Sequence, residues 1–312
     1  MGRLAFLFPG QGAQTVGMGR DFAEAFPSAA RVFEQAGQIL GWDVAAACFN
    51  GPQAELDRTS ISQPAILTVS AAIVAAMREA AVEQVKACSE VAGLSLGEYS
   101  ALVMAGALDF PDALRLVQQR GRFMEEACAQ NPGAMASILG LDDGIVEALC
   151  AQAREVGMVV AANFNSPGQV VVSGTREAVA RVSELARESQ ARRVLPLAVS
   201  GAFHSPLMEP AAERLQVELN GAPMKPCTMP VIANVTAAPV REPNEIRIAL
   251  ARQVKSPVLW SQSVRRMVED GCTRFVEVGP GKVLTGLMKR IAPDCKVVNV
   301  STVEMLRAGI EV

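Results

Sequence analysis

One serine in the sequence has the neighbours that a catalytic nucleophile needs. Ser95 lies in the stretch VAGLSLGEYSAL, with a glycine two residues to either side. A short apolar strand pattern precedes it, and a helical pattern begins at Leu96. A sharp turn between strand and helix exposes the serine hydroxyl, and glycines avoid side-chain clashes in such a turn. The pattern favours a nucleophile, while the alternative is a small residue in a turn, since this spacing also arises by chance.

A nucleophilic serine needs a base, and histidine accepts a proton best near neutral pH. His204 is the only histidine, and it lies in VSGAFHSPLMEP, a turn out of a predicted strand. A lone histidine is often structural, but no other histidine could serve Ser95. The carboxylates between them, Asp142 and Asp143, fall in an inserted segment. We therefore expect a backbone or amide carbonyl to orient the imidazole.

Two polar residues interrupt the apolar faces of predicted helices. In DALRLVQQRGRFMEEACAQ, Arg120 falls in the middle of the apolar side at about 100° per residue. A buried guanidinium needs partners, so Arg120 is either a structural ion pair, a side chain that extends to solvent, or a fork for a substrate carboxylate. Gln253 follows Ile246, Ala249 and Leu250 on another apolar face, where it is either a helix-end cap or a functional amide.

The composition excludes several classes of function. With a single histidine and seven scattered cysteines lacking a CxxC motif, we expect buried reduced thiols, no metal site and no disulfides. A net charge of −3 and an aromatic content of 4% argue against nucleic-acid binding. No apolar run reaches the about 18 residues of a membrane span, and the start has too short an apolar core for a secretion signal. We expect a cytoplasmic protein, or one in an equivalent organelle compartment such as a plastid stroma, without a membrane partner.

Strand and helix patterns alternate along most of the chain. The strand-like runs are RLAFLF, SEVAGL, PVIANV, TRFVEV and CKVVNVS. Their alternation with helices predicts an α/β fold with a parallel sheet covered on both faces. Residues 131–199 instead show the βαββαβ order of a ferredoxin-like unit, with the turn NSPGQ between its middle strands. We predict a large subdomain of residues 1–130 and 200–312, a small one of residues 131–199, and a substrate cleft between them.

The glycine-rich stretch FPGQGAQTVGMG follows the first predicted strand. Its glycine spacing fits neither GxGxxG nor GxxxxGK[ST], so we do not interpret it as a phosphate loop. A loop at the carboxyl end of a neighbouring strand can instead supply one backbone N–H to an oxyanion hole. The residue after the nucleophile, Leu96, supplies the other.

Seven collinear motifs resemble the family of malonyl-CoA:acyl-carrier-protein transacylases and the acyltransferase domains of polyketide synthases. They are FPGQGAQ, GLSLGEYSAL, QQRGRFM, NFNSPGQVVVSG, VSGAFHSPLM, QVKSPVLWSQSV and FVEVGPGKVL. The resemblance implies transfer of a malonyl group from malonyl-CoA to the phosphopantetheine thiol of acyl carrier protein through a seryl ester, for fatty acid synthesis. It also implies a hydrolase-like large subdomain with an inserted ferredoxin-like one. We expect no cofactor and a monomer.

The family pattern assigns a role to each candidate residue. It makes Ser95 the acylated nucleophile, His204 its base, and Arg120 the clamp for the malonyl carboxylate. It has Gln253 lend a carbonyl that orients His204. The remaining assignments are the oxyanion hole, formed by the backbone N–H groups of Gln11 and Leu96, and the bulky ring of Phe203, which in malonyl-type members disfavours an α-methyl branch.

Three points stay open at the level of sequence. Many family members carry histidine before the nucleophile, whereas this chain has Leu94. An acidic carrier protein implies a basic rim, for which the candidates are Lys255, Lys282, Lys289 and Arg290, although each fits an ordinary solvated surface too. The alternative functions are a serine thioesterase or esterase with water as acceptor, a patatin-like lipase with an aspartate base, and a catalytically silent docking module.

Overall fold

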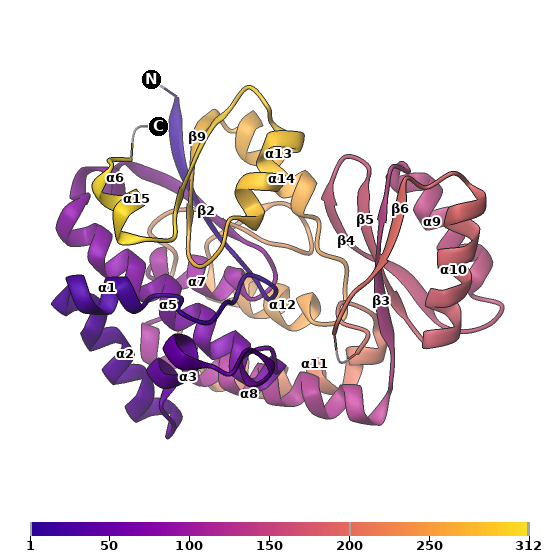
Figure 1. Ribbon diagram of the computed structural model, residues 1–312, viewed down its shortest axis with the longest axis horizontal. Coiled ribbons are helices and arrows are strands. Elements are labelled where there is room, and N and C mark those ends of the chain that lie inside the picture. The colour runs from indigo at the N-terminus through magenta and orange to yellow at the C-terminus, as the bar shows by residue number, and fades with distance from the viewer. Residues whose placement is uncertain (1, 200, 311–312) are drawn as a thin grey trace.

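Two β-sheets organise the chain in the computed structural model, which describes residues 2–199 and 201–310 (Figure 1). The large sheet has the strand order β10-β9-β1-β2-β7-β8, and the small sheet has the order β4-β5-β3-β6. The strands of the large sheet are β1 (Arg3–Phe8), β2 (Cys88–Gly93), β7 (Val231–Ile232), β8 (Pro239–Val240), β9 (Cys272–Val278) and β10 (Lys296–Val300). Those of the small sheet are β3 (Ala134–Leu139), β4 (Val159–Ser166), β5 (Gln169–Gly174) and β6 (Arg193–Pro196).

Most helices belong to the body built around the large sheet. Before the small sheet these are α1 (Arg20–Ala25), α2 (Pro27–Leu40), α3 (Val44–Asn50), α4 (Gln53–Leu56), α5 (Thr59–Ala80), α6 (Val82–Ala87), α7 (Gly97–Met104) and α8 (Phe110–Gln130). After it come a 3₁₀ turn (Pro206–Met208), α11 (Glu209–Gly221), α12 (Pro243–Gln253), α13 (Trp260–Glu269), α14 (Val283–Ile291) and α15 (Val303–Arg307). The small sheet carries α9 (Asp143–Ala153) and α10 (Arg176–Glu188), which lie together on one of its faces in Figure 1.

Helices cover both faces of the large sheet, as the sequence predicts. All pairs from β10 to β7 are parallel, and only β8 runs antiparallel. Alternate residues of β1 point to opposite faces, so Phe6 and Phe8 join the core under α2, α5 and α7. Leu7 joins a second core with Trp260 of α13 and Leu284 of α14. Apart from Arg3 at its start, β1 is apolar, and it is a central strand buried on both faces.

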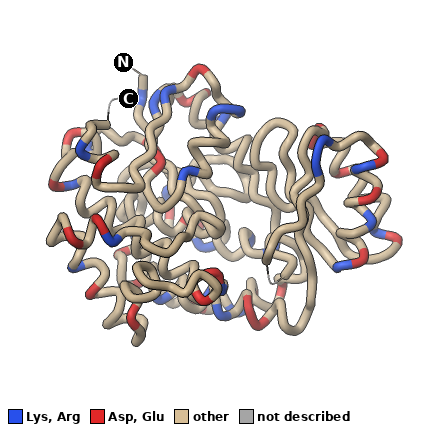
Figure 2. The backbone as a smooth tube through the Cα atoms, viewed as in Figure 1, with Lys and Arg blue, Asp and Glu red and all other residues tan. Residues whose placement is uncertain are grey.

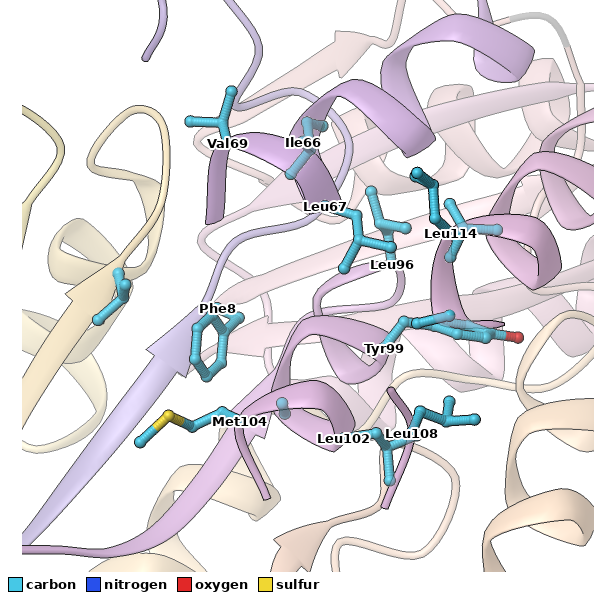
Figure 3. Packing of buried hydrophobic residues seen from close by; sticks show 14 of the residues in the cluster. Phe8, Ile66, Leu67, Val69, Leu96, Tyr99, Leu102, Met104, Leu108 and Leu114 are labelled. Carbon is cyan, nitrogen blue, oxygen red and sulfur yellow. The ribbon is translucent and has the colours of Figure 1, made fainter. Parts of the chain in front are cut away.

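The helix α5 corrects one expectation. It has 22 residues and is, by length and composition alone, apolar enough to cross a membrane, because scattered polar residues interrupt its apolar runs without making it polar on average. Inside the protein, 78% of its most apolar stretch is buried. Figure 3 shows Ile66, Leu67 and Val69 of α5 in the cluster that also holds Tyr99 of α7 and Phe8 of β1. Its length and apolar character thus match a core helix.

The small sheet is antiparallel throughout and has its own core against α9 and α10. Its middle hairpin turns at Pro167 and Gly168, where the predicted NSPGQ turn places a glycine with φ 68°. The edge strand β4 also hydrogen-bonds the large body, since the N–H of Phe164 donates to the carbonyl of Val258 at 3.0 Å. Main-chain bonds therefore fix how the two sheets meet.

One predicted strand is much shorter than expected. Of the run PVIANV, only Val231 and Ile232 are extended. The chain then turns, and the side chain of Asn234 bonds back to β2. Six of the seven cysteines are buried, as predicted, and Cys295 is partly exposed.

Candidate active site

Ser95 lies on the turn between β2 and α7, at the carboxyl end of a central strand. Its backbone is left-handed, with φ 51°, an unusual conformation for a residue with a side chain. A Cβ atom on Gly93 would lie 1.9 Å from the carbonyl carbon of Gly97, and one on Gly97 would lie 2.1 Å from the carbonyl oxygen of Phe8. Both glycines are thus required by close backbone approach.

His204 lies against Ser95, with its Nε2 2.8 Å from the Ser95 Oγ. Its Nδ1 is 2.7 Å from the main-chain carbonyl oxygen of Gln253, at the end of α12. A carbonyl only accepts, so Nδ1 carries the proton and Nε2 offers its lone pair to the serine hydroxyl. The main chain of α12 therefore takes the place of the carboxylate that sequence analysis could not find.

Burial lowers the pKa of His204 to about 4. The positive charge of Arg120 lowers it further, while hydrogen bonds to the carbonyls of Gln253 and Ser256 oppose the shift. A neutral imidazole is the form that accepts a proton, so the environment keeps His204 competent as a base at neutral pH.

Arg120 is buried in α8, with 1% of its surface exposed. Its Nη1 donates to Gln63 Oε1 at 2.5 Å, and its Nη2 donates to Ser95 Oγ at 3.0 Å and to Gln253 Oε1 at 2.9 Å. No carboxylate among the described residues forms an ion pair with it. Desolvation lowers the pKa of Arg120. Neither a structural ion pair nor a solvent-directed side chain describes this guanidinium, which rests on neutral acceptors beside the serine.

Three further residues support this cluster and were not predicted from the sequence, namely Gln63, Glu98 and Asn234. Asn234 Oδ1 accepts from the N–H of Ser95 at 2.7 Å, and its Nδ2 donates to the carbonyl of Gly93 at 2.7 Å. Glu98 Oε2 accepts from Gln253 Nε2 at 2.7 Å. Asn234 lies two residues after the parallel strand β7, at the carboxyl end of the sheet, a position typical of functional residues, so its location was a usable signal.

A cleft of about 470 Å³ opens in front of Ser95. The large body lines it with Gln11, Ser95, Phe203 and His204, and the small sheet lines it with Asn163, Asn165 and Val171 among others. The predicted cleft between the two bodies is present, and Phe203 forms part of its wall. Arg120 is not among the residues that line the cleft. It contacts Ser95 from the side of the protein interior.

The two predicted oxyanion donors lie near this cleft. Gln11 lines it, and Leu96 caps α7 directly after Ser95. Within residues 2–199 and 201–310, neither backbone N–H donates to a protein acceptor. Neither N–H group is therefore committed to another hydrogen bond within those residues, as the predicted role requires.

The four candidate residues of the basic rim have different surroundings. Lys255 pairs with Glu209 at 2.5 Å, and Arg290 donates to Gln169 of the small sheet at 2.6 Å. Lys282 and Lys289 are exposed, and Lys282 adjoins Val283 in the cleft wall. Figure 2 shows charges of both signs spread over the molecule. Across the described part of the chain, no group of three or more His, Cys, Asp or Glu residues could hold a metal ion.

Comparisons with known proteins agree with this geometry. The family model described as acyl transferase domain matches residues 5–305. The chain is 46% identical over 308 residues to a malonyl CoA-acyl carrier protein transacylase of Haemophilus influenzae, covering 99% of this chain and 98% of that protein. It is 47% identical over 291 residues to the protein of that name from Escherichia coli, covering 93% of each.

Solved structures give the same result. A structure described as a type II polyketide synthase acyl-carrier protein in complex with its malonyl-transacylase matches with a TM-score of 0.95 and 43% identity, covering 99% of both chains. An acyl-carrier-protein S-malonyltransferase of Burkholderia pseudomallei matches with a TM-score of 0.94 and 41% identity, covering 99% of this chain and all of that one. The chain has the α/β fold of these proteins, and it belongs to the acyl transferase domain family.

Proposed function

We propose that this protein transfers the malonyl group of malonyl-CoA to the phosphopantetheine thiol of acyl carrier protein, feeding fatty acid synthesis. The observation that carries the proposal is the buried guanidinium of Arg120, whose Nη2 lies 3.0 Å from the Oγ of Ser95. A buried cation at this position would not contribute to the binding of an apolar acyl group. It can form a charge-assisted pair with an acyl group that bears a carboxylate.

In the first half-reaction, Ser95 Oγ attacks the thioester carbonyl of malonyl-CoA while His204 Nε2 takes the hydroxyl proton. The negative charge that develops on the carbonyl oxygen is stabilised by the N–H groups of Gln11 and Leu96. The carbon–sulfur bond then breaks, and the coenzyme A thiol leaves with the proton from His204. The product is a malonyl ester on Ser95.

In the second half-reaction, the same steps run with a different thiol. His204 takes the proton of the phosphopantetheine thiol, the sulfur attacks the ester carbonyl, and Ser95 regains its proton from His204. The enzyme alternates between two stable forms, so its kinetics should be ping-pong.

Arg120 supplies the selectivity for a carboxylate. One methylene separates the malonyl carboxylate from the ester carbonyl, so the carboxylate of a group held on Ser95 lies within reach of the guanidinium that now contacts Ser95 Oγ. The carboxylate would replace neutral acceptors with a charged one, which strengthens the interaction. The ring of Phe203 in the cleft wall would limit the room for an α-methyl branch.

Acyl carrier protein would approach the cleft over the small sheet and α14. Lys282, Lys289 and Arg290 are the candidate contacts, and the pairing of Lys255 with Glu209 makes it a weaker one. Malonyl-CoA and the carrier protein are the proposed partners, with neither nucleic acid nor membrane. We further propose a monomer that works without a resident cofactor, in the cytoplasm or an organelle stroma.

The proposed subdomains are residues 1–130 and 200–312 for a hydrolase-like body, and residues 131–199 for a ferredoxin-like one. Residues 1, 200 and 311–312 lie outside the described part of the chain. The strand order β4-β5-β3-β6, with two helices on one face, supports the ferredoxin-like assignment.

The decisive experiment is intact-mass measurement after brief mixing with malonyl-CoA, before and after adding carrier protein. We expect a malonyl adduct on the unsubstituted chain that moves to the carrier protein, and none on Ser95→Ala. Release of free malonate without transfer would make the protein a thioesterase. An adduct on Ser95→Ala, or unaltered activity of His204→Ala, would refute the mechanism.

A further inference from the structure

Glu98 is a buried carboxylate that the proposed reaction does not use. It lies in the first turn of α7, three residues after Ser95, with 1% of its surface exposed. Its Oε2 accepts from Gln253 Nε2 at 2.7 Å and from the backbone N–H of Asn234 at 3.3 Å. Burying a carboxylate costs free energy unless hydrogen bonds or opposite charges compensate, so a buried carboxylate in the centre of the site needs a structural explanation.

The amide of Gln253 joins Glu98 to Arg120. Gln253 Oε1 accepts from Arg120 Nη2 at 2.9 Å, while Nε2 of the same amide donates to Glu98 and, at 2.8 Å, to the carbonyl of Ser95. The amide dipole therefore points its oxygen at the buried cation and its N–H groups at the buried anion. Each of the two charges stabilises this orientation of the amide.

An ionised carboxylate can only accept hydrogen bonds, and a guanidinium can only donate them. Between these two partners, the amide of Gln253 has one satisfied orientation. Without the carboxylate, Nε2 would keep only the carbonyl of Ser95 and the more distant Oδ1 of Asn234 as acceptors, so the amide would be held less firmly. A rotation that presents Nε2 to Arg120 would set two donors facing each other. Arg120 would then lose one of its fixed acceptors beside Ser95.

The arrangement also keeps Glu98 away from Arg120. A direct ion pair would occupy the guanidinium fork and compete with any substrate carboxylate. With one amide between them, Glu98 balances the buried positive charge while Arg120 contacts only neutral acceptors in the described part of the chain.

We propose that Glu98 is a positioning residue, which fixes the amide of Gln253 and so holds Arg120 in place for the carboxylate of the acyl group. This role rests on the proposed malonyl transfer. It predicts that Glu98 controls the preference between donors with and without a carboxylate, rather than the chemistry of acylation as such.

The test compares kcat/KM for acylation of Ser95 by malonyl-CoA and by acetyl-CoA. Glu98→Gln removes the charge but keeps the size, and we expect the malonyl to acetyl ratio to fall by about tenfold to a hundredfold, the effect of one charge-assisted hydrogen bond. The matched control is Glu90→Gln, since Glu90 is equally buried but lies within β2, where it accepts from Cys272 and contacts neither Gln253 nor Arg120. Its ratio should stay unchanged.

A second variant covers a folding failure of Glu98→Gln. Gln253→Leu cuts the link between Glu98 and Arg120 but keeps the main-chain carbonyl that holds His204. Its ratio should fall as well, and in the double variant the two losses should not add, because both remove the same link. Equal loss of both donors in Glu98→Gln, or an unchanged ratio in either single variant, would overturn the role of Glu98.

The pH dependence of the malonyl to acetyl ratio provides an independent test of the role of Glu98. Burial raises the pKa of Glu98 to about 7, although the hydrogen bonds from Gln253 and Asn234 and the charge of Arg120 favour its ionised form. Tyr99 and Arg120 are the charged or titratable groups that act on it, and neither changes its charge near neutral pH.

The ratio should therefore decline between about pH 8.5 and about pH 5.5 in the unsubstituted chain and stay flat in Glu98→Gln. A decline of the same size in Glu98→Gln would contradict the proposal. If the unsubstituted chain shows no malonyl preference at all, the proposed function itself fails, and the role of Glu98 fails with it.

Discussion

At the scale of single residues, the site is a small set of side chains with unusual surroundings. Ser95 and His204 both have left-handed backbones, with φ 51° and 57°. Such conformations cost free energy, and the surrounding hydrogen bonds hold them. The N–H of Ser95 is held by Asn234, and that of His204 donates to the carbonyl of Val254 at 3.1 Å. With the two backbones held in this way, the Ser95 hydroxyl and the His204 imidazole lie 2.8 Å apart.

The lowered pKa of His204 predicts the pH dependence of acylation. The base must be neutral, and its pKa of about 4 keeps it neutral well below the ordinary value of about 6.5. The rate of acylation of Ser95 by acetyl-CoA, a donor with no carboxylate for Arg120 and Glu98 to position, should therefore hold from neutral pH to about pH 5 and decline as the pH falls through about 4. Rapid-mixing measurements of adduct formation would show this limb, and a decline centred near pH 6.5 would contradict the expectation.

Arg120 should determine the choice of acyl group. Arg120→Ala removes the charged donor beside Ser95, so malonyl transfer should fall by roughly a hundredfold or more, as expected for loss of a charge-assisted pair. Acetyl transfer, which has no carboxylate to place, should be retained or rise. The measurement is kcat/KM for each donor. Equal loss for both would leave Arg120 a purely structural role.

At the scale of elements, the nucleophile turn depends on the close approach of β1, β2 and α7. The carbonyl of Phe8 on β1 accepts from the N–H of Leu94 at 3.0 Å, which ties the turn to the neighbouring strand. Gly97 lies so close to Phe8 that no Cβ fits. The loop after β1 and the turn after β2 thus meet at the carboxyl end of the sheet, where the oxyanion donors are proposed.

Gly97→Ala should therefore destabilise the protein. Its Cβ would lie 2.1 Å from a backbone oxygen, and backbone cannot move as a flexible side chain can. We expect a loss of at least about 2 kcal/mol in the free energy of unfolding, measured by denaturant titration. The matched control is Gly286→Ala in α14, where a Cβ meets nothing within 4 Å and helix propensity should add about 0.5–1 kcal/mol. Equal stability of both variants would contradict this account of the turn.

At the scale of the whole molecule, two bodies share one cleft. The edge strand β4 bonds the segment at Val258, and Arg290 of α14 reaches Gln169 of β5. These contacts place exposed basic side chains of α14 beside the small sheet and close to the cleft wall. A carrier protein with a negative surface would meet both bodies at once.

Salt should weaken this encounter. Because exposed charges are screened over about 10 Å at 0.1 M salt, the KM for carrier protein should rise steeply with ionic strength. Free pantetheine, an acceptor with the same thiol but no protein surface, is the control and should show little change. Lys289→Glu should raise the KM for carrier protein, whereas Lys86→Glu, on the distant α6, should not. A salt-independent KM would argue against a basic docking surface.

The sequence by itself determined the local pieces of this protein. The glycines around Ser95, the alternating strand and helix patterns, and the apolar face around Arg120 all depend on neighbours within one or two turns of chain, and the structure contains each of them. The same holds for the turn at Gly168. Local sterics and burial periodicity are written in consecutive residues, which is why these features could be predicted.

Only the tertiary structure decided how those pieces meet. The carbonyl that holds His204 lies on the main chain of Gln253, 49 residues away, and the contacts of Asn234 and Glu98 with the site span 139 and 155 residues. Any backbone carbonyl can accept a hydrogen bond, so the residue type does not indicate which carbonyl will accept the one from His204. Such choices follow from strand order and helix packing, which bring distant segments to the same end of a sheet.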